Sequence, residues 1–308
     1  MSPWSPAEIS DRSDQTAIVT GANSGLGFEA TKELARAGAH VVMAGRDRAR
    51  LSNAREEIRG AVEGASLTLG ELDLASLDSV RSFAATVESN LDRVDVLCNN
   101  AGIMAVPRAE TDDGFEAQFG VNHLGHFALT GRLLDALTAA PDPRVVTHSS
   151  GLHTRGRMAF EDLHGEDEYD RWDAYAQSKL ANLLFAYELD RRYGDVLTSV
   201  ACHPGWAATN LQRRAPERMG SRLRLMAMGA ANRLFAQSAA KGAWPMLYAA
   251  TDQSLDGGEY VGPGGLFNMR GPPVEQRSSD RSHDADDAAE LWRRSETLTG
   301  VEYGPVDP

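Results

Sequence analysis

The sequence predicts a single α/β domain, in which a doubly wound parallel sheet of about seven strands carries helices on both faces. Between residues 16 and 251, short apolar or β-branched runs alternate with longer segments whose apolar residues recur every three to four positions. No repeat of about 20 to 50 residues and no low-complexity linker interrupts this alternation. Because each crossover between parallel strands lays a helix over the sheet, this alternation is typical of a parallel sheet covered on both faces.

Seven segments have the composition of strands, each a short apolar or β-branched run beside turn residues. In chain order they are Thr16–Thr20, His40–Ala44, Leu67–Leu72, Val94–Asn99, Arg144–Ser149, Leu197–His203 and Glu259–Val261. Helical periodicity predicts helices at Gly25–Ala37, Arg48–Arg59, Ser76–Ser89, Asp112–Leu137, Asp173–Arg192 and Ser238–Ala250, and a late one at Asp286–Leu298. Gly38 and Gly194 follow two of these helices and mark their ends.

Two segments break the alternation. From Ala207 to Gln237, leucines and methionines are interleaved with arginines, which predicts short amphipathic helices outside the sheet. This segment is either a lid over a site or a basic, solvated helix pair packed on the body, and the sequence leaves both interpretations open. From Gly262 onward the chain is rich in glycine and proline and then acidic. We therefore expect one domain over residues 1–308, with halves of about 14–150 and 151–262 and a tail of about 263–308.

The composition is that of a globular protein. Hydrophobic residues make up 42% and charged residues 24%, which excludes intrinsic disorder, collagen and coiled coils. The chain has 31 basic and 44 acidic residues and a net charge of −13. Its arginines are spread among carboxylates, whereas a nucleic-acid-binding surface needs clustered positive charge, so we expect no nucleic-acid partner.

Cysteines and apolar runs bear on the cellular setting. Cys98 and Cys202 lie at the ends of predicted strands, which favours reduced core thiols over a disulfide bridge. The first 16 residues contain acids and lack the apolar stretch of a signal peptide, and no later run approaches the ~18 apolar residues of a membrane span. We expect a cytoplasmic protein without an integral membrane segment.

A glycine-rich turn follows the first predicted strand and opens the first predicted helix. Residues 20–27 read Thr-Gly-Ala-Asn-Ser-Gly-Leu-Gly. Glycines allow backbone N–H groups and the positive end of a helix to approach a pyrophosphate closely, where larger residues would block it. The order of strand, glycines and helix predicts dinucleotide binding. The residues expected to hold the dinucleotide are Gly21, Asn23, Ser24, Gly25, Leu26 and Gly27.

The tip of the second predicted strand distinguishes between the two nicotinamide cofactors. A carboxylate there would bind the ribose hydroxyls of NAD(H), whereas a guanidinium would pair with the 2′-phosphate of NADP(H). Arg46 follows Gly27 by 19 residues, near the usual spacing of about 20. It predicts NADP(H) as the preferred cofactor, with NAD(H) as the alternative. In the competing interpretation, Arg46 is one of many surface arginines and Asp47 only caps the next helix.

Polar residues end three further predicted strands, at the edge where a parallel sheet presents its ligands. Asp73 follows the third strand and Asn99 ends the fourth, and each could bind the cofactor or form a turn. Ser149 and Ser150 end the fifth, where a hydroxyl could hold a substrate oxygen. Neither serine stands in a Gly-x-Ser-x-Gly motif, so a nucleophilic hydrolase is not favoured.

A tyrosine and a lysine four residues apart form the candidate catalytic pair. The chain has only three lysines, and Lys179 follows Tyr175 on a predicted helix, where residues four apart share a face. A free tyrosine, with a pKa near 10, is a poor base at neutral pH. An adjacent ammonium and a cationic nicotinamide ring would both lower this pKa, so the pair could move a proton near neutral pH.

Four histidines invite a metal-site interpretation. His123 and His126 lie three residues apart on a predicted helix, with His148 and His153 near the fifth strand. No carboxylate or cysteine completes a recognisable ligand set, so we expect no metal.

In this order, the motifs resemble those of the short-chain dehydrogenase/reductase family, which has a Rossmann-type fold, over about Thr16 to Tyr303. Residues 20–27 match T-G-x-x-x-G-x-G, 99–102 match N-N-A-G, 175–179 match Y-x-x-x-K and 204–209 match P-G-x-x-x-T. The H-L-G-H-F run at 123–127 and the S-K-L-A-N run at 178–182 look most like the branch of retinol dehydrogenases and WW-domain oxidoreductases.

The resemblance implies a role for each matching residue. In the catalytic set, Asn122 would hold a water in a proton relay, Ser150 rather than Ser149 would orient the substrate oxygen, Tyr175 would be the general acid/base, and Lys179 would hold the nicotinamide ribose. Residues about 14–150 become the cofactor half and 151–262 the catalytic and substrate half. The resemblance also adds further residues to the expected cofactor site: Asp73, Leu74, Asn99, Ala101, Gly102, Pro204, Gly205 and Thr209.

The main functional hypothesis is an NADP(H)-preferring oxidoreductase that transfers hydride between nicotinamide and a small-molecule carbonyl or secondary alcohol. Methionines in 207–237 hint at a lipophilic substrate, although methionines at helical spacing also serve packing. A reductase of a C=C or C=N bond, or an epimerase, would retain the same tyrosine and lysine. A non-catalytic dinucleotide sensor or scaffold on the same fold is the alternative from another class.

The resemblance also bears on assembly and specificity. Such families often form homodimers or homotetramers through helices such as the one carrying Tyr175, so we expect a homo-oligomer. The membrane-bound retinol dehydrogenases carry an N-terminal anchor, and none is expected here. The 25 residues from Ser150 to Tyr175 are expected to border the substrate pocket through Phe160, Leu163, Tyr169 and Trp172.

Overall fold

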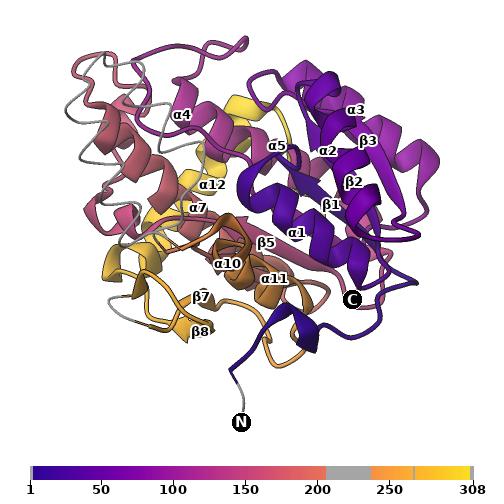
Figure 1. Ribbon diagram of the computed structural model, residues 1–308. Helices are drawn as coiled ribbons and strands as arrows, with labels where there is room; N and C mark the ends of the chain where they lie inside the picture. Colours follow the sequence, from indigo (N-terminus) through magenta and orange to yellow (C-terminus); the bar gives the residue numbers. More distant parts are fainter. Residues whose placement is uncertain (1–2, 206–236, 266–267, 306–308) are drawn as a thin grey trace, which may run out of the picture.

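The computed structural model describes residues 3–205, 237–265 and 268–305 (Figure 1). Its centre is an eight-stranded sheet in the order β3-β2-β1-β4-β5-β6-β7-β8. Strands β1 to β7 run parallel, so the predicted doubly wound parallel sheet is confirmed. The strands are β1 (Thr16–Thr20), β2 (His40–Gly45), β3 (Leu67–Glu71), β4 (Val96–Asn99), β5 (Arg144–His148), β6 (Thr198–Cys202), β7 (Tyr260–Pro263) and β8 (Pro273–Gln276).

Helices connect the strands and cover both faces of the sheet. The α-helices are α1 (Gly25–Arg36), α2 (Arg48–Ala61), α3 (Leu77–Asn90), α4 (Ala117–Phe119), α5 (Gly125–Arg132), α6 (Leu134–Thr138), α7 (Arg171–Tyr193), α10 (Ala239–Gly242), α11 (Trp244–Thr251) and α12 (Ala285–Thr299). Short 3₁₀ segments are η1 (Pro6–Glu8), η3 (Gly151–Arg155), η4 (Phe160–Asp162) and η6 (Asp280–His283), and η2 (Gly120–Leu124) is a π-helical turn.

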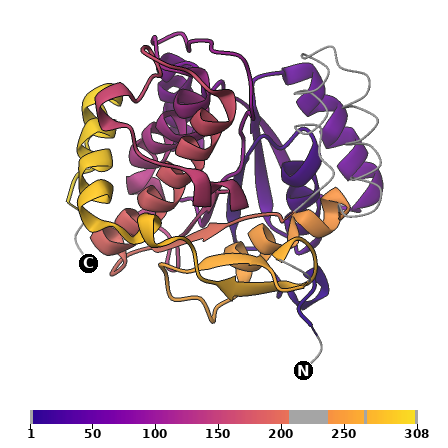
Figure 2. The ribbon, with the colours of Figure 1, turned by 90° about the vertical axis from the view of Figure 1, so that its left-hand side faces the viewer.

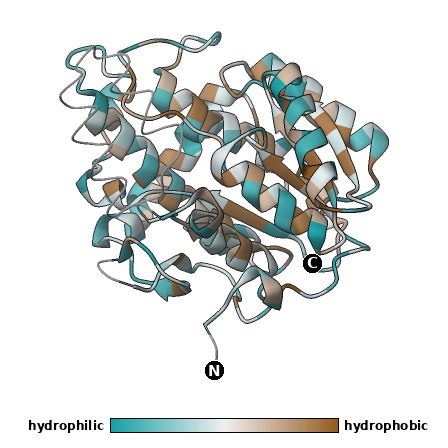
Figure 3. Ribbon diagram, in the orientation of Figure 1, coloured by the Kyte–Doolittle hydropathy of each residue, from teal (hydrophilic) through white to brown (hydrophobic). Residues whose placement is uncertain are grey.

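Successive residues of the central strands enter different hydrophobic clusters. Ala17 and Val19 pack in one cluster with α1, α2 and α11, whereas Ile18 packs in another with α3, α5 and α7. A strand covered on both faces needs apolar side chains at consecutive positions, which explains why these strands read as unbroken apolar runs. Figure 3 shows the same pattern, with hydrophobic strands inside and hydrophilic outer faces on the helices.

Helix α12 adds a further layer outside α7. Leu291 of α12 packs in one cluster with Leu180 and Leu184 of α7, and the buried ring of Trp292 stacks on Phe185 with centroids 5.9 Å apart. In Figure 2, α12, drawn in yellow, forms the outer edge of the molecule beyond α7. Helix α7 therefore lies between the sheet and α12, and all its residues from 175 to 186 are buried.

Strand β8 has no counterpart among the predicted strands. It pairs antiparallel with β7 at the end of the sheet, and Val274 is 40% exposed there. Its four residues, Pro-Val-Glu-Gln, are too few and too exposed to show a strand pattern. Pairing with β7, rather than local sequence, gives this segment its structure.

The single helix predicted over Asp112–Leu137 is wrong at its start and in its middle. Gly114 adopts a φ of +83° in a turn, and Glu116 then caps α4 by accepting the backbone N–H groups of Gln118 and Phe119 at 3.0 and 2.7 Å. The π turn η2 follows before α5. π turns inside helices are frequent at functional sites, and this one contains Asn122.

The helix predicted over Ser238–Ala250 is two helices, α10 and α11. Pro245 stands in the first turn of α11, where its missing N–H costs no helical hydrogen bond, although the same residue would break a continuous helix. The segment Ala207–Gln237, interpreted above as a lid or a helix pair, lies outside the described residues except for Gln237.

Cys98 and Cys202 are both buried and form no disulfide bridge. Burial raises the pKa of the Cys98 thiol to about 12, so it is inert at neutral pH. Within the ranges that the structure describes, no helix has both the length and the apolar character to span a bilayer.

Candidate active site

A cleft opens at the carboxyl ends of the parallel strands, beside β1 and β4. Between β1 and β4 the order of the strands in the sheet reverses, and ligands bind at such a reversal in folds of this type. The cleft brings together most of the residues predicted for the cofactor and catalytic sites. Its lining includes Gly21, Asn23, Ser24, Gly25, Leu26, Gly27, Arg46, Asp73, Leu74, Ala101, Gly102, Ser149, Ser150, Tyr175, Lys179, Pro204 and Gly205.

The glycine turn between β1 and α1 forms one end of the cleft. Gly21 and Gly25 have φ angles of +71° and +60°, which favour glycine. A Cβ on Gly27 would lie 2.5 Å from the Gly21 carbonyl oxygen, so this position has no room for a side chain. The turn thus forms a tight backbone cradle at the N-terminus of α1, and its shape and chemistry fit a dinucleotide pyrophosphate.

Thr20 joins this turn to the end of β4. Its Oγ1 accepts the backbone N–H groups of Asn100 and Ala101, both at 2.9 Å, and lies 2.9 Å from Nε2 of His126. His126 Nδ1 lies 3.0 Å from the Asn122 carbonyl oxygen, so the ring donates there and accepts from Thr20. Burial lowers the pKa of His126 to about 4, which keeps the ring neutral.

Asn122 occupies the π turn behind the cleft. Its Oδ1 accepts the Ile103 N–H at 2.8 Å, and its Nδ2 donates to the Ile103 carbonyl and to Ser178 Oγ at 3.0 and 2.9 Å. A Cβ on Gly102 would lie 3.0 Å from Asn122 Oδ1 and 3.6 Å from Lys179 Nζ. The side chain of Asn122 therefore braces the chain next to Lys179 and does not line the cleft.

Tyr175 and Lys179 lie on one face of α7, as their spacing predicts. Lys179 Nζ is 5.8 Å from the centroid of the Tyr175 ring and donates to the His148 carbonyl at 3.0 Å. Burial lowers the pKa of Lys179 to about 8. Burial also raises the pKa of Tyr175 to about 12, and a hydrogen bond with the Ser150 side chain opposes this rise. The expected lowering is thus not found in this structure, in which burial is the largest cause of the shift in the pKa of Tyr175.

The two serines after β5 have different surroundings. Ser149 is buried, and its Oγ donates to the Lys179 carbonyl at 2.7 Å, which anchors α7 to the strand end. Ser150 is half-buried, and its Oγ accepts the Leu152 N–H at 3.2 Å at the start of η3. Accepting this bond leaves the Ser150 hydroxyl proton free for Tyr175 or a substrate oxygen.

The side chains beside β2 and β3 match both interpretations of Arg46 and Asp47. Asp47 caps α2 by accepting the Arg50 N–H at 3.0 Å, while Arg46 is exposed and lines the cleft. Asp73 also lines the cleft, and it accepts the Ala75 N–H at 3.0 Å as a turn former. Asp73 thus has both a local role and a place at the cleft, whereas Asp47 caps α2 outside the cleft lining.

Asn99 is not brought to the cleft. It is 1% exposed, and its amide donates to Thr130 Oγ1 at 3.0 Å in the interior. The next residue, Asn100, lines the cleft and donates to the Thr20 carbonyl at 2.7 Å. Successive residues at a strand end point to opposite faces, so the N-N-A-G match alone could not separate the two asparagines. Thr209 lies outside the described residues.

Two of the four histidines considered as metal ligands, His123 and His126, are bonded to protein groups. His123 Nε2 lies 2.8 Å from Ser295 Oγ, and His126 is bonded to Thr20 and Asn122. In the part of the chain that the structure describes, no three histidine, cysteine or acidic residues are placed to share a metal ion.

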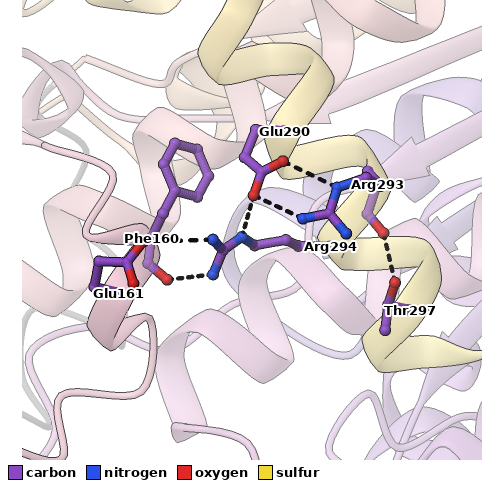
Figure 4. Close-up of polar contacts among 6 residues, drawn as sticks. All are labelled: Phe160, Glu161, Glu290, Arg293, Arg294 and Thr297. Carbon is purple, nitrogen blue, oxygen red and sulfur yellow. Dashed lines mark hydrogen bonds and ion pairs between the residues drawn. The ribbon is translucent and has the colours of Figure 1, made fainter.

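The segment between Ser150 and Tyr175 differs from expectation. Phe160, Leu163, Tyr169 and Trp172 do not line the cleft formed by the described residues. Instead, Leu163 is buried against α7 and α12, and Arg294 of α12 holds the segment. Figure 4 shows Arg294 between Glu290, at 2.5 Å, and the Phe160 carbonyl, and its guanidinium lies 5.3 Å from the centroid of the Phe160 ring.

Several cleft residues have no counterpart among the predicted site residues. Most are apolar or glycine, so neither residue type nor spacing identifies them. Thr20, Asn100 and His148 are polar: Thr20 and Asn100 stand inside the quoted motifs, and His148 ends β5. These residues are Thr20, Ala44, Gly45, Leu72, Asn100, Ile103, Met104, Val121 and His148.

Comparison with known proteins assigns the family. A family profile described as short chain dehydrogenase matches residues 15–220, and the chain belongs to this family. It is therefore an NAD(P)-dependent dehydrogenase or reductase acting on CH–OH or C=O groups.

Individual relatives place the chain in the branch that its sequence resembles. Retinol dehydrogenase 13 of Homo sapiens is 41% identical over 296 residues, which cover 95% of this chain and 86% of that protein. Polyprenol dehydrogenase of Mus musculus is 38% identical over 309 residues, covering 98% and 89%. A crystal structure of a protein from Mycobacterium paratuberculosis matches with a TM-score of 0.81 and 43% identity, covering 99% of this chain and 100% of that one. The retinol dehydrogenase-like resemblance is thus confirmed.

Proposed function

We propose that this protein is an NADP(H)-preferring oxidoreductase that interconverts a carbonyl and a secondary alcohol, with Tyr175 as general acid/base. One observation carries the proposal. A single cleft holds the glycine turn and Arg46 at one end and the catalytic candidates at the other, namely Ser150, Tyr175 and Lys179.

The chain's own contribution at the first end is binding. The backbone N–H groups at the start of α1 would hold the pyrophosphate, and the Arg46 guanidinium would pair with the 2′-phosphate. Lys179 would hold the nicotinamide ribose. When bound, the cofactor supplies or accepts the hydride.

At the second end, the chain moves a proton. Because burial raises the pKa of Tyr175 to about 12, the phenol keeps its proton at neutral pH and can donate it to a carbonyl oxygen. The Ser150 hydroxyl, beside this phenol, orients that oxygen. In the oxidative direction, the charges of Lys179 and of an oxidised nicotinamide favour the phenolate, which can then accept the alcohol proton.

We propose a lipophilic alcohol or carbonyl as the substrate class. Ile103, Met104 and Val121 give the cleft apolar walls. Two relatives are named for retinol and polyprenol, which are both apolar alcohols. Burial of a chain of methylene groups would supply about 0.8 kcal/mol each to binding.

Assembly as a homodimer or homotetramer stays a proposal, and so does a cytoplasmic location. Helix α7 is not a free surface for self-association, because α12 covers its outer side. We therefore place any interface between copies elsewhere on the surface.

The test is NADPH oxidation with a panel of ketones of increasing chain length, with wild type and Tyr175→Phe side by side. We expect turnover that improves with chain length, and a loss in the variant of about 1000-fold or more in kcat, since it lacks the proton donor. NADPH binding should change less than about twofold.

Two outcomes would contradict the proposal. Unchanged turnover in Tyr175→Phe would remove Tyr175 from the reaction. Tight NADPH binding without oxidation by any carbonyl would favour the sensor or scaffold alternative, and analysis of the products would reveal reduction of a C=C or C=N bond instead.

A further inference from the structure

One histidine sits directly behind Ser150 and touches the C-terminal part of the chain. His153 is 3% exposed and belongs to η3, the 3₁₀ turn that Ser150 begins. Its Nδ1 lies 2.7 Å from the Ser150 carbonyl oxygen, and its Nε2 accepts the backbone N–H of Ser279 at 3.1 Å. The ring of Tyr260 in β7 packs edge-on against it, with centroids 5.4 Å apart.

These two contacts determine the protonation state of the ring. A carbonyl oxygen can only accept, so Nδ1 carries a hydrogen and donates it to Ser150. The Ser279 N–H can only donate, so Nε2 carries no hydrogen. The neutral ring with its proton on Nδ1 satisfies both partners, and burial, which lowers the pKa of His153, favours the neutral form.

The contact with Ser150 bears on the orientation of its hydroxyl. The Ser150 carbonyl also accepts the backbone N–H of His153 at 3.0 Å, while Ser150 Oγ accepts the N–H of Leu152. The backbone and side chain of Ser150 are thus both bonded within the first turn of η3. His153 connects this turn to Ser279, which is 126 residues away in sequence.

We propose that His153 is a positioning residue for Ser150, which it holds at the angle that Tyr175 and the substrate oxygen require through its hydrogen bond to the Ser150 carbonyl. The proposal rests on the proposed function, since it assumes that Ser150 orients the substrate. The imidazole acts through the Ser150 carbonyl and has no contact with the reacting atoms.

A neighbouring contact provides a matched control. Arg281 Nη1 donates to the Gly156 carbonyl at 3.0 Å, so it ties the same two segments together one turn further from Ser150. Replacing Arg281 weakens the link between η3 and the C-terminal part without touching the Ser150 carbonyl. A purely structural role for His153 would make the two sites behave alike.

The experiment compares His153→Asn, His153→Gln and Arg281→Gln. Asparagine places an amide near the Nδ1 position and can still donate to Ser150, whereas glutamine reaches toward the Nε2 position and loses that bond. We expect His153→Gln to lower kcat about tenfold with little change in NADPH affinity, and His153→Asn and Arg281→Gln to stay within about threefold of wild type. In Ser150→Ala, adding His153→Gln should cost nothing further, because the residue being positioned is gone.

A second measurement does not depend on catalysis. Amide hydrogen exchange of residues 151–155 should rise about tenfold in His153→Gln and remain near wild type in Arg281→Gln. Unchanged exchange in His153→Gln overturns the proposal whatever the enzyme does. Equal kcat losses in the Asn and Gln variants, or an additive loss in the double variant, also overturn it. An inactive wild type contradicts the proposed function instead, and the exchange result still decides the role of His153.

Discussion

The two ends of the cleft obtain their geometry from different parts of the chain. At the cofactor end, eight consecutive residues, 20–27, form a backbone cradle in which Gly21 has a φ of +71° and Gly27 has no room for a Cβ. At the catalytic end, buried side chains bond to the backbone of distant segments: Ser149 Oγ donates to the Lys179 carbonyl, and Lys179 Nζ donates to the His148 carbonyl.

This difference determines how each end can fail. A side chain added to the glycine turn disrupts the backbone cradle, because the turn has no room for a Cβ at Gly27. The catalytic end fails when a proton donor or a hydrogen-bond partner is lost, because its shape depends on those contacts. His126 joins the two ends, since it bonds Thr20 on one side and Asn122 on the other.

The largest effect is expected at the catalytic end, where replacing Ser150 and replacing Ser149 should have different consequences. Ser150→Ala removes the hydroxyl beside Tyr175 and should lower kcat about 100-fold without weakening NADPH binding. Ser149→Ala removes only the anchor to the Lys179 carbonyl, and we expect it to cost about 1 kcal/mol of unfolding free energy with a much smaller loss of kcat. Steady-state kinetics and urea denaturation measure both quantities, and a larger kcat loss in Ser149→Ala would reverse the assignment.

At the cofactor end, Gly27→Ala tests the backbone cradle. Its Cβ would meet the Gly21 carbonyl at 2.5 Å, so the turn must shift, and we expect NADPH affinity to fall about 30-fold. Gly60→Ala is the matched control, because Gly60 is helical and exposed, and a methyl group there would meet no atom within 4 Å. That control should raise stability by about 0.5–1 kcal/mol. Equal NADPH affinity in wild type and Gly27→Ala would show that the cradle is not the binding site.

A smaller effect is expected at Arg46, where a side chain rather than the backbone would select the cofactor. Arg46→Ala should weaken NADPH binding about tenfold and leave NADH binding unchanged, because only NADPH has the 2′-phosphate. Arg59→Ala is the control, because it removes the same positive charge from the surface at the far end of α2, beside Glu56. Nicotinamide fluorescence titrations of both variants check this, and a parallel loss for NADH and NADPH would make Arg46 a general charge rather than a phosphate-specific residue.

The smallest effect concerns the pH dependence of stability, to which His126, between the two ends of the cleft, contributes. Burial lowers its pKa to about 4 from 6.5, so between these values the unfolded chain binds a proton that the folded chain does not. Stability therefore falls as the pH drops below 6.5, by at most about 1.4 kcal/mol per pH unit from this residue, and the loss levels off below 4. Urea denaturation of wild type and His126→Gln from neutral to acidic pH should give a shallower slope for the variant. Equal slopes would mean that His126 is not neutral in the folded protein.

The candidate catalytic pair shows what the local sequence pattern can predict and what it cannot. Tyr175 and Lys179 could be found from their four-residue spacing, because a helix turns in a way that places such residues on one face. Their protonation could not be found in this way. Spacing predicts a lowered tyrosine pKa beside an ammonium, whereas burial in the fold raises the pKa of Tyr175 to about 12.

Asn99, Asn100 and the helices within residues 112–137 show what the local sequence pattern does not determine. The motif at 99–102 identifies the right strand end but not which asparagine faces the cleft, because the direction of a side chain depends on the pleat and on the neighbouring Thr130. The periodicity over Asp112–Leu137 suggests one helix, and only packing of the preceding turn and the π turn at Asn122 divides it.

For this protein, the order of apolar runs, the glycine turn and the tyrosine–lysine pair determine the parallel sheet and the class of chemistry, and they predict the dinucleotide-binding end. They do so because backbone geometry and residue periodicity act over a few neighbouring positions. The tertiary structure alone decides which serine is anchored, which asparagine reaches the cleft, and that Ser279 and Arg294 hold the segment after Ser150. Those features depend on burial and on contacts between residues far apart in the chain, which no local pattern encodes.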